Sequence, residues 1–387
     1  MIVLHTNFLK GWGGQSNRVL TEAAGVAAKG HRVVVACPPK SQLAARTEAT
    51  ASALGIATLS ADESIRFVGG FRWGVLNDVF AMKHLLLTLA PDILHLHGGR
   101  DSWTAAAALA LLPRTAKRPR VIRTKHNVFP VSRHPANRWF YARRCDMLVG
   151  LSQAIVRQLS EIPGVDPARI RRIPSAVDLA RFDTPPPDPA RRAALRAELG
   201  IAPGDTVVAM TGRLRPEKGH ATLIAAAPAI LAARPDVRFL LLGSGSSRGS
   251  LESDLARDPA TAARFTLTGF RDDVPDCLRV ADLYVQPSHS EGLGTSVIEA
   301  GAARLPIAAS DTGGIPDVVA HGETGLLFLV GDAPALAAAV LRLLSNPGEA
   351  ARYGAAARAR AFDEFATGPL VERTLAAYEE CLSLPAR

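Results

Sequence analysis

Short apolar runs alternate with alanine- and leucine-rich stretches of helical periodicity along the first half of the chain. The apolar runs predict strands at 2–5, 32–37, 93–97, 121–125 and 147–151. The periodic stretches between them predict helices at 16–28, 76–89 and 102–112. Strands that alternate with helices in this way indicate a parallel sheet covered by helices on both faces.

The same alternation starts again after a proline-rich break at 184–189, which can continue neither a helix nor a central strand. Strands are predicted at 207–210, 238–242, 265–268, 283–286 and 307–309. Helices are predicted at 221–233, 250–258 and 296–303. The chain is therefore expected to be an α/β protein of two doubly wound, Rossmann-like domains facing a central cleft. Ligands in such sheets bind beyond the carboxyl ends of the strands.

The predicted domain boundaries follow from this break. An N-terminal domain is expected over 1–183, a linker over 184–204 and a C-terminal domain over 205–365. The remaining residues, 366–387, contain an amphipathic pattern over 371–382 that predicts one helix. The sequence does not indicate where this helix docks.

The composition of the chain also indicates where in the cell the protein is expected. Of the 387 residues 48% are apolar, yet no apolar run approaches the ~18 residues of a membrane span. The first residues lead into a strand without the basic head and apolar core of an export signal. The four cysteines are isolated and show neither metal-ligand spacing nor a disulfide framework. We expect a cytoplasmic protein, with peripheral contact to the inner face of the cell membrane as a further possibility.

Positive charge is concentrated in the first half of the chain. Residues 1–185 contain 25 Lys and Arg against 12 Asp and Glu, whereas residues 186–387 contain 20 against 24. Between Asp101 and Asp146 there are ten basic residues and no acidic one. Such a field attracts anionic partners, although a solvated basic surface would show the same pattern.

Two loops in the second half combine charges with glycines. The segment 210–220 follows a predicted strand, precedes a helix and contains Arg213 and Lys218. An arginine fork and a lysine point charge at the carboxyl edge of a sheet suit a diphosphate. The competing interpretation is a basic turn in solvent.

The second loop, 288–300, gives the more specific signal. It follows the predicted strand 283–286 and opens a helix, with glycines at 292 and 294 that let a ligand approach the backbone. Glu291 lies just before this helix and Glu299 about one turn inside it. Two carboxylates in these positions suit hydroxyl groups on either side of a phosphate. A capping turn with a surface glutamate is the alternative.

This pattern resembles the retaining glycosyltransferases of family 4, which have the two-domain GT-B architecture. The pair of glutamates separated by seven residues carries the resemblance, together with Gly-Arg-Leu at 212–214 and Lys-Gly at 218–219. The resemblance covers nearly the whole chain and is densest over 207–327. Further matching segments are 281–285, 309–316 and 322–327.

The resemblance implies roles for individual residues of the second half. Arg213 and Lys218 would bind the diphosphate of a nucleotide-sugar donor, and Glu299 would bind the ribose hydroxyls. Glu291 would hold the transferred sugar together with the backbone of Gly292, Leu293, Gly294 and Thr295. Phe270 and Arg271 lie where such enzymes hold the nucleotide base, which is a looser match. GT-B enzymes generally need no catalytic metal, and we expect no cofactor; the sequence shows no Asp-x-Asp metal motif.

The first half offers weaker candidates. The glycine loop with Gly13 and Gly14 matches the family's loop near the donor, and His126 matches its active-site histidine. His97 has a similar but weaker claim, and a lone histidine is more often a core residue. Candidate acceptor-binding residues are His97, Arg100, Arg138, Arg143 and Arg144.

The segment 133–144 interleaves basic and aromatic residues, as does a segment that rests on an anionic membrane or binds a phosphorylated glycolipid. The alternative is a helix that buries Trp139 and Phe140 and leaves the arginines in solvent. No nucleic-acid-binding module accompanies the segment, so nucleic acid is not expected as a partner.

The sequence therefore predicts transfer of a sugar, with retention of configuration, to a lipid-linked or lipopolysaccharide-type glycan. Two alternatives stay open at this point. A non-hydrolysing nucleotide-sugar epimerase has the same fold, and a two-lobed nucleotide-sugar-binding protein would lack catalysis.

Overall fold

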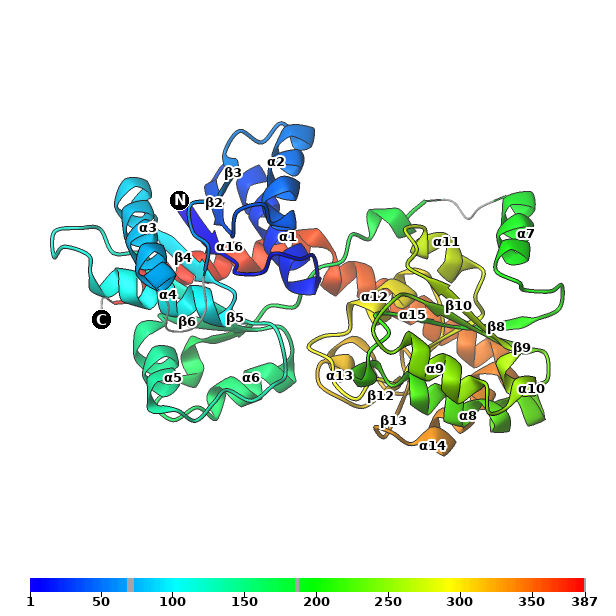
Figure 1. Cartoon of the computed structure of the whole chain (residues 1–387). Coiled ribbons are helices and arrows are strands. Elements are labelled where there is room, and N and C mark those ends of the chain that lie inside the picture. The colour runs from blue at the N-terminus through cyan, green and yellow to red at the C-terminus, as the bar shows by residue number, and fades with distance from the viewer. Residues whose placement is uncertain (68–72, 185–187, 386–387) are drawn as a thin grey trace. The chain divides into compact units, whose positions relative to one another are not determined.

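The computed structural model describes residues 1–67, 73–184 and 188–385, and its chain divides into two compact units (Figure 1). Unit 1 comprises Met1–Ala176 and Thr367–Arg387, and unit 2 comprises Val177–Ala366. Each unit contains one fully parallel sheet with helices packed on its faces. The predicted fold class is confirmed for each unit.

The sheet of unit 1 has seven strands in the order β3-β2-β1-β4-β5-β6-β7. This order places the first strand beside the fourth, as in doubly wound folds. The strands are β1 (Ile2–Thr6), β2 (Arg32–Ala36), β3 (Leu59–Asp62), β4 (Ile93–Leu96), β5 (Arg120–Lys125), β6 (Met147–Gly150) and β7 (Ile170–Arg172). The helices are α1 (Gly14–Ala28), α2 (Gln42–Leu54), α3 (Trp73–Leu89), α4 (Gly99–Ala110), α5 (Pro135–Trp139), α6 (Gln153–Ser160) and α16 (Thr367–Ser383).

The sheet of unit 2 has six strands in the order β10-β9-β8-β11-β12-β13. They are β8 (Thr206–Thr211), β9 (Val237–Leu242), β10 (Phe265–Gly269), β11 (Leu283–Gln286), β12 (Ile307–Ser310) and β13 (Leu326–Phe328). The helices are α7 (Pro189–Glu198), α8 (His220–Ala233), α9 (Arg248–Leu255), α10 (Pro259–Ala262), α11 (Val274–Arg279), α12 (Thr295–Ala302), α13 (Ile315–Val318), α14 (Ala333–Ser345) and α15 (Pro347–Phe365). The cores of both sheets are apolar residues buried on two faces, which is why their strands read as continuous apolar runs.

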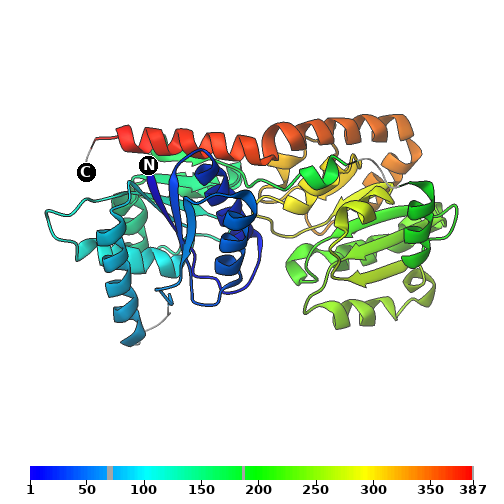
Figure 2. The same ribbon diagram turned by 90° about the horizontal axis from the view of Figure 1, so that it is seen from above.

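The C-terminal helix α16 belongs to unit 1 and packs against α1 (Figures 1 and 2). Leu370, Ala377 and Tyr378 of α16 join the apolar core of the unit-1 sheet. At Gly25 of α1 an added Cβ would lie 2.1 Å from Val371 Cγ2, so glycine allows this close contact. The docking site that the sequence left open is therefore the α1 face of unit 1.

The division of the chain differs from the predicted boundaries. The first unit ends at Ala176 instead of residue 183, and the C-terminal segment returns to it. Part of the predicted linker forms α7, because Asp188 caps its first turn through Arg191 N and Pro189 fits the first helical position. The prolines at 185–187 lie outside the described residues. No helix in the described part of the chain is long and apolar enough to cross a membrane.

Candidate active site

Two loops meet at the carboxyl edge of the unit-2 sheet, one after β8 and one after β11. The N–H of His289 donates to the carbonyl of Glu217 at 2.8 Å and joins them. At Gly219 (φ 72°) an added Cβ would lie 1.8 Å from the carbonyl oxygen of Pro287, so this approach requires glycine. The segments 210–220 and 288–300, which the family resemblance assigns to one donor site, therefore lie together at this edge of the sheet.

An ion pair joins these loops. Lys218 Nζ donates to Glu291 Oε1, with the two side chains only 16% and 10% exposed. Ser288 Oγ donates to the same carboxylate oxygen at 3.0 Å. The N–H of Gly314 donates to the Glu291 carbonyl at 3.0 Å and fixes the backbone. Lys218 and Glu291, predicted to bind diphosphate and sugar separately, are partners of each other in this structure.

Behind Glu291 lies a buried polar network that the sequence did not indicate. Tyr284 Oη donates to Gln286 Oε1 at 2.7 Å, and Gln286 Nε2 donates to Ser288 Oγ at 2.7 Å. Ser296 of α12 donates to the same Gln286 oxygen at 3.0 Å. The network fixes the Ser288 hydroxyl that binds Glu291. The only signal in the sequence is a run of polar residues at the end of an apolar strand.

The beginning of α12 provides an anion-binding element next to this pair. Gly294 precedes the helix in the left-handed conformation, with φ 92°. The first N–H groups of a helix have no helical partners and attract negative charge. Thr295 at the first position is exposed. Thr295 and the first N–H groups of α12 can therefore contact a bound phosphate or sugar, whereas Leu293 and Gly294 are buried.

Arg213 and Glu299 differ in their surroundings. The Arg213 side chain is exposed and has no ion-pair partner among the described residues, so its guanidinium is available to an anionic ligand. Glu299 of α12 is partly buried, and burial raises the pKa of its carboxyl to about 7 despite the opposing charge of Arg181. Near neutral pH Glu299 is thus present both as acid and as carboxylate.

Arg271 is already committed to acidic partners within unit 2. Its Nε and Nη2 donate to the two oxygens of Asp273 at 2.7 and 2.6 Å, and its Nη1 donates to Glu198 at 2.6 Å. These hydrogen bonds raise its pKa further. Phe270, by contrast, is 74% exposed. Of the two residues predicted near the base, Phe270 offers a free aromatic surface, and Arg271 holds the loop that carries it.

The glycine loop of unit 1 precedes α1 and leaves open space. An added Cβ at Gly13 or Gly14 would meet no atom within 4 Å. Gly13 has extended backbone with φ 179°, so neither sterics nor conformation requires glycine there. The open space agrees with a loop that a ligand approaches.

Four histidines meet inside unit 1. His97 Nε2 lies 2.9 Å from His5 Nδ1, and His97 Nδ1 lies 3.0 Å from His126 Nε2. His95 lies beside them, with its ring centroid 4.2 Å from that of His97. His126 Nδ1 is buried and has no partner within the described residues. Burial lowers the pKa of His97 and His126 well below the ordinary value.

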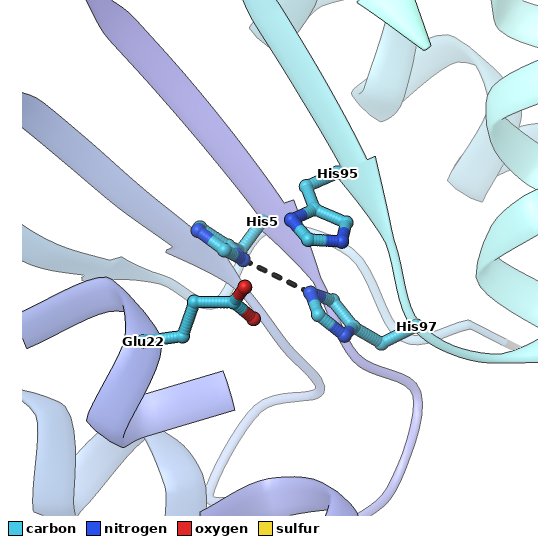
Figure 3. Close-up of side chains that lie close together, drawn as sticks. All are labelled: His5, Glu22, His95 and His97. Atoms are coloured by element: carbon cyan, nitrogen blue, oxygen red, sulfur yellow. Dashed lines mark hydrogen bonds between the residues drawn. The ribbon is translucent and has the colours of Figure 1, made fainter. Parts of the chain in front are cut away.

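Figure 3 shows Glu22 of α1 facing three of these rings, His5, His95 and His97. One ligand atom from each of the four residues lies within 4.8 Å of the others, so by chemistry the group could hold a metal ion. The sequence predicted no metal site and did not single out His5. Residues 5 and 95 are direct neighbours in the β1–β4 register, which the predicted strands could have suggested.

The candidate acceptor residues are divided between several contacts. Arg100 lies over the Phe8 ring at 5.5 Å, and Arg144 lies over Trp139 at 5.5 Å. Arg138 Nε donates to the Pro163 carbonyl at 2.9 Å. A surface hollow of about 280 Å³ is lined by Pro135, Arg138, Trp139, Ala142, Arg143, Pro163 and Gly164.

The alternative in which Trp139 and Phe140 are both buried is half right. Phe140 is 3% exposed and packs against Trp103, whereas Trp139 is 45% exposed. The helix changes at this point from α5 to a π-helical turn over Phe140–Arg144. Trp139 is thus left on the surface among arginines.

The model for "Glycosyltransferase Family 4" matches residues 12–181, and the model for "Glycosyl transferases group 1" matches residues 191–360. A GDP-mannose-dependent monoacylated alpha-(1-6)-phosphatidylinositol monomannoside mannosyltransferase from Corynebacterium glutamicum is 33% identical over 285 residues, 70% of this chain and 73% of that protein. The chain belongs to glycosyltransferase family 4.

A second relative and a solved structure are also similar to this chain. A D-inositol 3-phosphate glycosyltransferase from Nocardia farcinica is 35% identical over 240 residues, which are 60% of this chain and 52% of that protein. A glycosyltransferase structure from Rickettsia africae has a TM-score of 0.85 at 18% identity, covering 99% of both chains. The chain is a glycosyltransferase that uses a nucleotide sugar, and the predicted GT-B fold is confirmed.

Proposed function

We propose that this glycosyltransferase transfers a hexose from its nucleotide donor to a hydroxyl of a phosphate-bearing, lipid-linked acceptor, with retention of configuration. The observation that carries the donor half is the pairing of Lys218 with Glu291 beside the beginning of α12. A cation, a carboxylate and free N–H groups at one sheet edge supply partners for both a diphosphate and a sugar hydroxyl.

The leaving group explains why cations are needed at this edge. When the bond from the sugar anomeric carbon to the diphosphate breaks, negative charge develops on the departing oxygen. Arg213, Lys218 and the first N–H groups of α12 stabilise that charge. Glu291 accepts from sugar hydroxyls, and Glu299 binds the ribose. We expect no catalytic metal for this charge, since the two cations and the helix N-terminus can stabilise it.

The resemblance to the retaining enzymes of family 4 supports retention of configuration. The acceptor oxygen forms its bond to the anomeric carbon on the face from which the diphosphate departs. The acceptor's proton passes to a diphosphate oxygen, so the products are the glycoside and the nucleoside diphosphate. Product analysis by NMR of the new anomeric proton tests this step. Inverted configuration would refute it.

The acceptor class is supported by unit 1 and by the relatives. Both curated relatives reported above carry an inositol phosphate or phosphatidylinositol in their names. The hollow beside Arg138 and Arg143 offers positive charge and an aromatic surface to such a headgroup. A lipopolysaccharide-type glycan also carries phosphate and lipid, and it stays within the proposed class.

Peripheral contact with an anionic membrane is the second half of this proposal. The α3 helix exposes Leu76, Phe80 and Leu87, which lie on one helical face, at 51%, 58% and 43%. Exposed apolar side chains along one helical face are typical of interfacial binding. Liposome flotation with and without anionic lipid tests the contact, with Phe80→Glu expected to weaken it. Flotation that is absent at low salt would refute it.

Donor binding is tested with a panel of nucleotide sugars in a thermal-shift assay, since a ligand that binds only the native state stabilises it. We expect one donor to raise the melting temperature of the wild-type protein and to leave that of Arg213→Ala unchanged. Family membership disfavours the epimerase and binding-protein alternatives. Incubation of the donor alone tests the epimerase, which would change the configuration of the donor sugar. Incubation with acceptors tests the binding protein, which would release no nucleoside diphosphate.

A further inference from the structure

A continuous chain of hydrogen bonds runs through unit 1 from the C-terminal helix α16 to His126. The Tyr378 hydroxyl of α16 lies 3.2 Å from His5 Nε2, and His5 Nδ1 lies 2.9 Å from His97 Nε2. His97 Nδ1 then lies 3.0 Å from His126 Nε2. The Tyr378 hydroxyl also lies 2.7 Å from His95 Nδ1. His5, His95, His97 and Tyr378 are at most 1% exposed.

Proton counting restricts how this chain can be arranged. A neutral imidazole donates from one nitrogen and accepts at the other. Burial lowers the pKa of His5 to about 4 and of His95 to about 3, so both rings are neutral at pH 7. Three hydrogen bonds connect Tyr378 to His126 through His5 and His97. Each of them contains one proton only if every group donates in the same direction along the series. The tautomer of His126 is thereby coupled to the hydroxyl of Tyr378.

The unpartnered nitrogen of His126 decides between the two directions. If the protons point toward His126, its Nδ1 carries a buried N–H without an acceptor. If they point away, Nε2 carries the proton and Nδ1 is a bare acceptor. A buried N–H without a partner is the less favourable of the two, as the rarity of orphaned buried N–H groups shows.

We propose that Tyr378 and His5, acting through His97, hold His126 with its proton on Nε2 and leave Nδ1 free to accept from a substrate hydroxyl. This inference rests on the proposed contact of His126 with substrate. Tyr378, His5 and His97 are positioning residues. Helix α16 therefore has a role in the reaction through Tyr378, besides its packing on α1.

The charged side chains beside these histidines are consistent with neutral imidazole rings. The pair of Arg18 and Glu22 from α1 lies beside it, fully buried, with Arg18 Nη2 3.5 Å from Glu22 Oε1. Thr374 of α16 donates to the same oxygen at 2.7 Å. At His5 and His95 the positive charge of Arg18 lowers the pKa and the negative charge of Glu22 raises it, so burial remains the main effect.

A metal ion held by the residues in Figure 3 is the competing interpretation. The hydrogen bonds argue against it, because both ring nitrogens of His5, His95 and His97 already have partners. A divalent cation would break several of these bonds and would lie near the guanidinium of Arg18. It would also uncouple His126 from Tyr378.

The first experiment is Tyr378→Phe, which removes one hydroxyl and keeps the ring. We expect kcat to fall on the order of tenfold, as for outer partners of functional histidines, with the KM of the donor nearly unchanged. Tyr353→Phe is the matched control, since Tyr353 is equally buried at 1% exposure but donates to Glu349 in unit 2. A kcat within twofold of wild type for Tyr378→Phe would overturn the inference.

A double-mutant cycle tests whether Tyr378 acts through His126. In the His126→Ala background, Tyr378→Phe should lower kcat no further, because coupled residues are not additive. A full additional tenfold loss would overturn the coupling. If His126→Ala by itself retains normal kcat, the proposed role of His126 fails instead, so the two failures are distinguishable.

A third measurement needs neither a variant nor activity. Long-range ¹H–¹⁵N NMR of protein labelled at its histidines reports which ring nitrogen carries the proton, with His126→Gln used to assign the signal. We expect a neutral His126 protonated on Nε2. A proton on Nδ1 would overturn the inference, as would one equivalent of zinc found by elemental analysis of protein purified from zinc-supplemented medium.

Discussion

Breaking the Lys218–Glu291 ion pair should lower the stability of the protein by an amount that its burial allows us to calculate. Both side chains are largely buried, so Lys218→Met leaves a carboxylate with one hydrogen bond from Ser288 and no counter-charge. Breaking a buried pair costs about 3–5 kcal/mol, and the partial exposure of this pair reduces the expected cost to about 2–4 kcal/mol. For a unit of this size that corresponds to a melting temperature lower by ~4–16 °C.

The reverse change is expected to cost less. In Glu291→Gln, the Lys218 ammonium can turn to solvent on its flexible stem, whereas Glu291 in Lys218→Met is held in place by its loop. The double variant should be more stable than Lys218→Met alone, because it removes the unpaired charge. All three variants should lower kcat/KM for the donor on the order of 100-fold, as expected for groups that stabilise developing charge.

Thermal and urea unfolding measure the stability half of this prediction, and release of nucleoside diphosphate measures the catalytic half. Arg248→Met is the matched control, because Arg248 and Glu252 form a pair in the same unit that is 45% and 52% exposed. Exposed pairs contribute about 0–1 kcal/mol. If Lys218→Met destabilises no more than Arg248→Met, the assigned burial and coupling are wrong. Normal donor turnover in Lys218→Met would refute its role with the diphosphate.

The remaining predictions concern single groups. Donor affinity should rise about tenfold between pH 6 and pH 8, because the Glu299 pKa of about 7 makes the ribose-binding carboxylate scarce at the lower pH. Titration calorimetry of Glu299→Gln should show no such pH dependence of donor affinity. A retained pH dependence would mean that another group causes it. Arg213→Ala should lower kcat for the donor by ~10²–10³ with an unchanged circular dichroism spectrum, and near-normal turnover would contradict it. Phe270→Ala should raise the donor KM several-fold, since base stacking on an aromatic ring contributes about 1–3 kcal/mol; an unchanged KM would exclude stacking there. His5 and His95, with folded pKa values of about 4 and about 3, bind protons more readily when unfolded. Stability should therefore be complete above pH 6.5 and fall by about 1.4 kcal/mol per histidine per pH unit below it, and urea midpoints that do not change between pH 7 and pH 5 would refute the burial of neutral rings.

The sequence predicts the sheets better than it predicts their edges. Every strand it predicts is present, because a strand buried on both faces must be a continuous apolar run. The short edge strands β3, β7 and β13 are missed. The residues of β3 and β7 mix apolar with polar side chains, and β13 is an apolar run of only three residues. The docking of α16 is missed for a different reason: its contact with Gly25 joins residues more than 300 positions apart.

The candidate site shows the same division. Arg213, Lys218, Glu291 and Glu299 could be found because strand, glycine and charge follow one another within short segments. The Lys218–Glu291 ion pair and the commitment of Arg271 to Asp273 and Glu198 could not, because both depend on side-chain geometry. The histidine chain was only half visible, since His97 and His126 lie at strand ends but Tyr378 comes from the far end of the chain.

The central claim is that the unit-2 loops hold a nucleotide sugar whose hexose is passed to a phosphate-bearing lipid. The most direct test incubates the protein with ¹⁴C-labelled GDP-mannose or UDP-glucose and vesicles containing phosphatidylinositol, and follows the label into the lipid phase. We predict labelled lipid and nucleoside diphosphate in equal amounts for one of these donors, and about 100-fold less of both with Glu291→Gln. Labelled lipid formed equally well by Glu291→Gln, or diphosphate released without transfer to any lipid, would contradict the account.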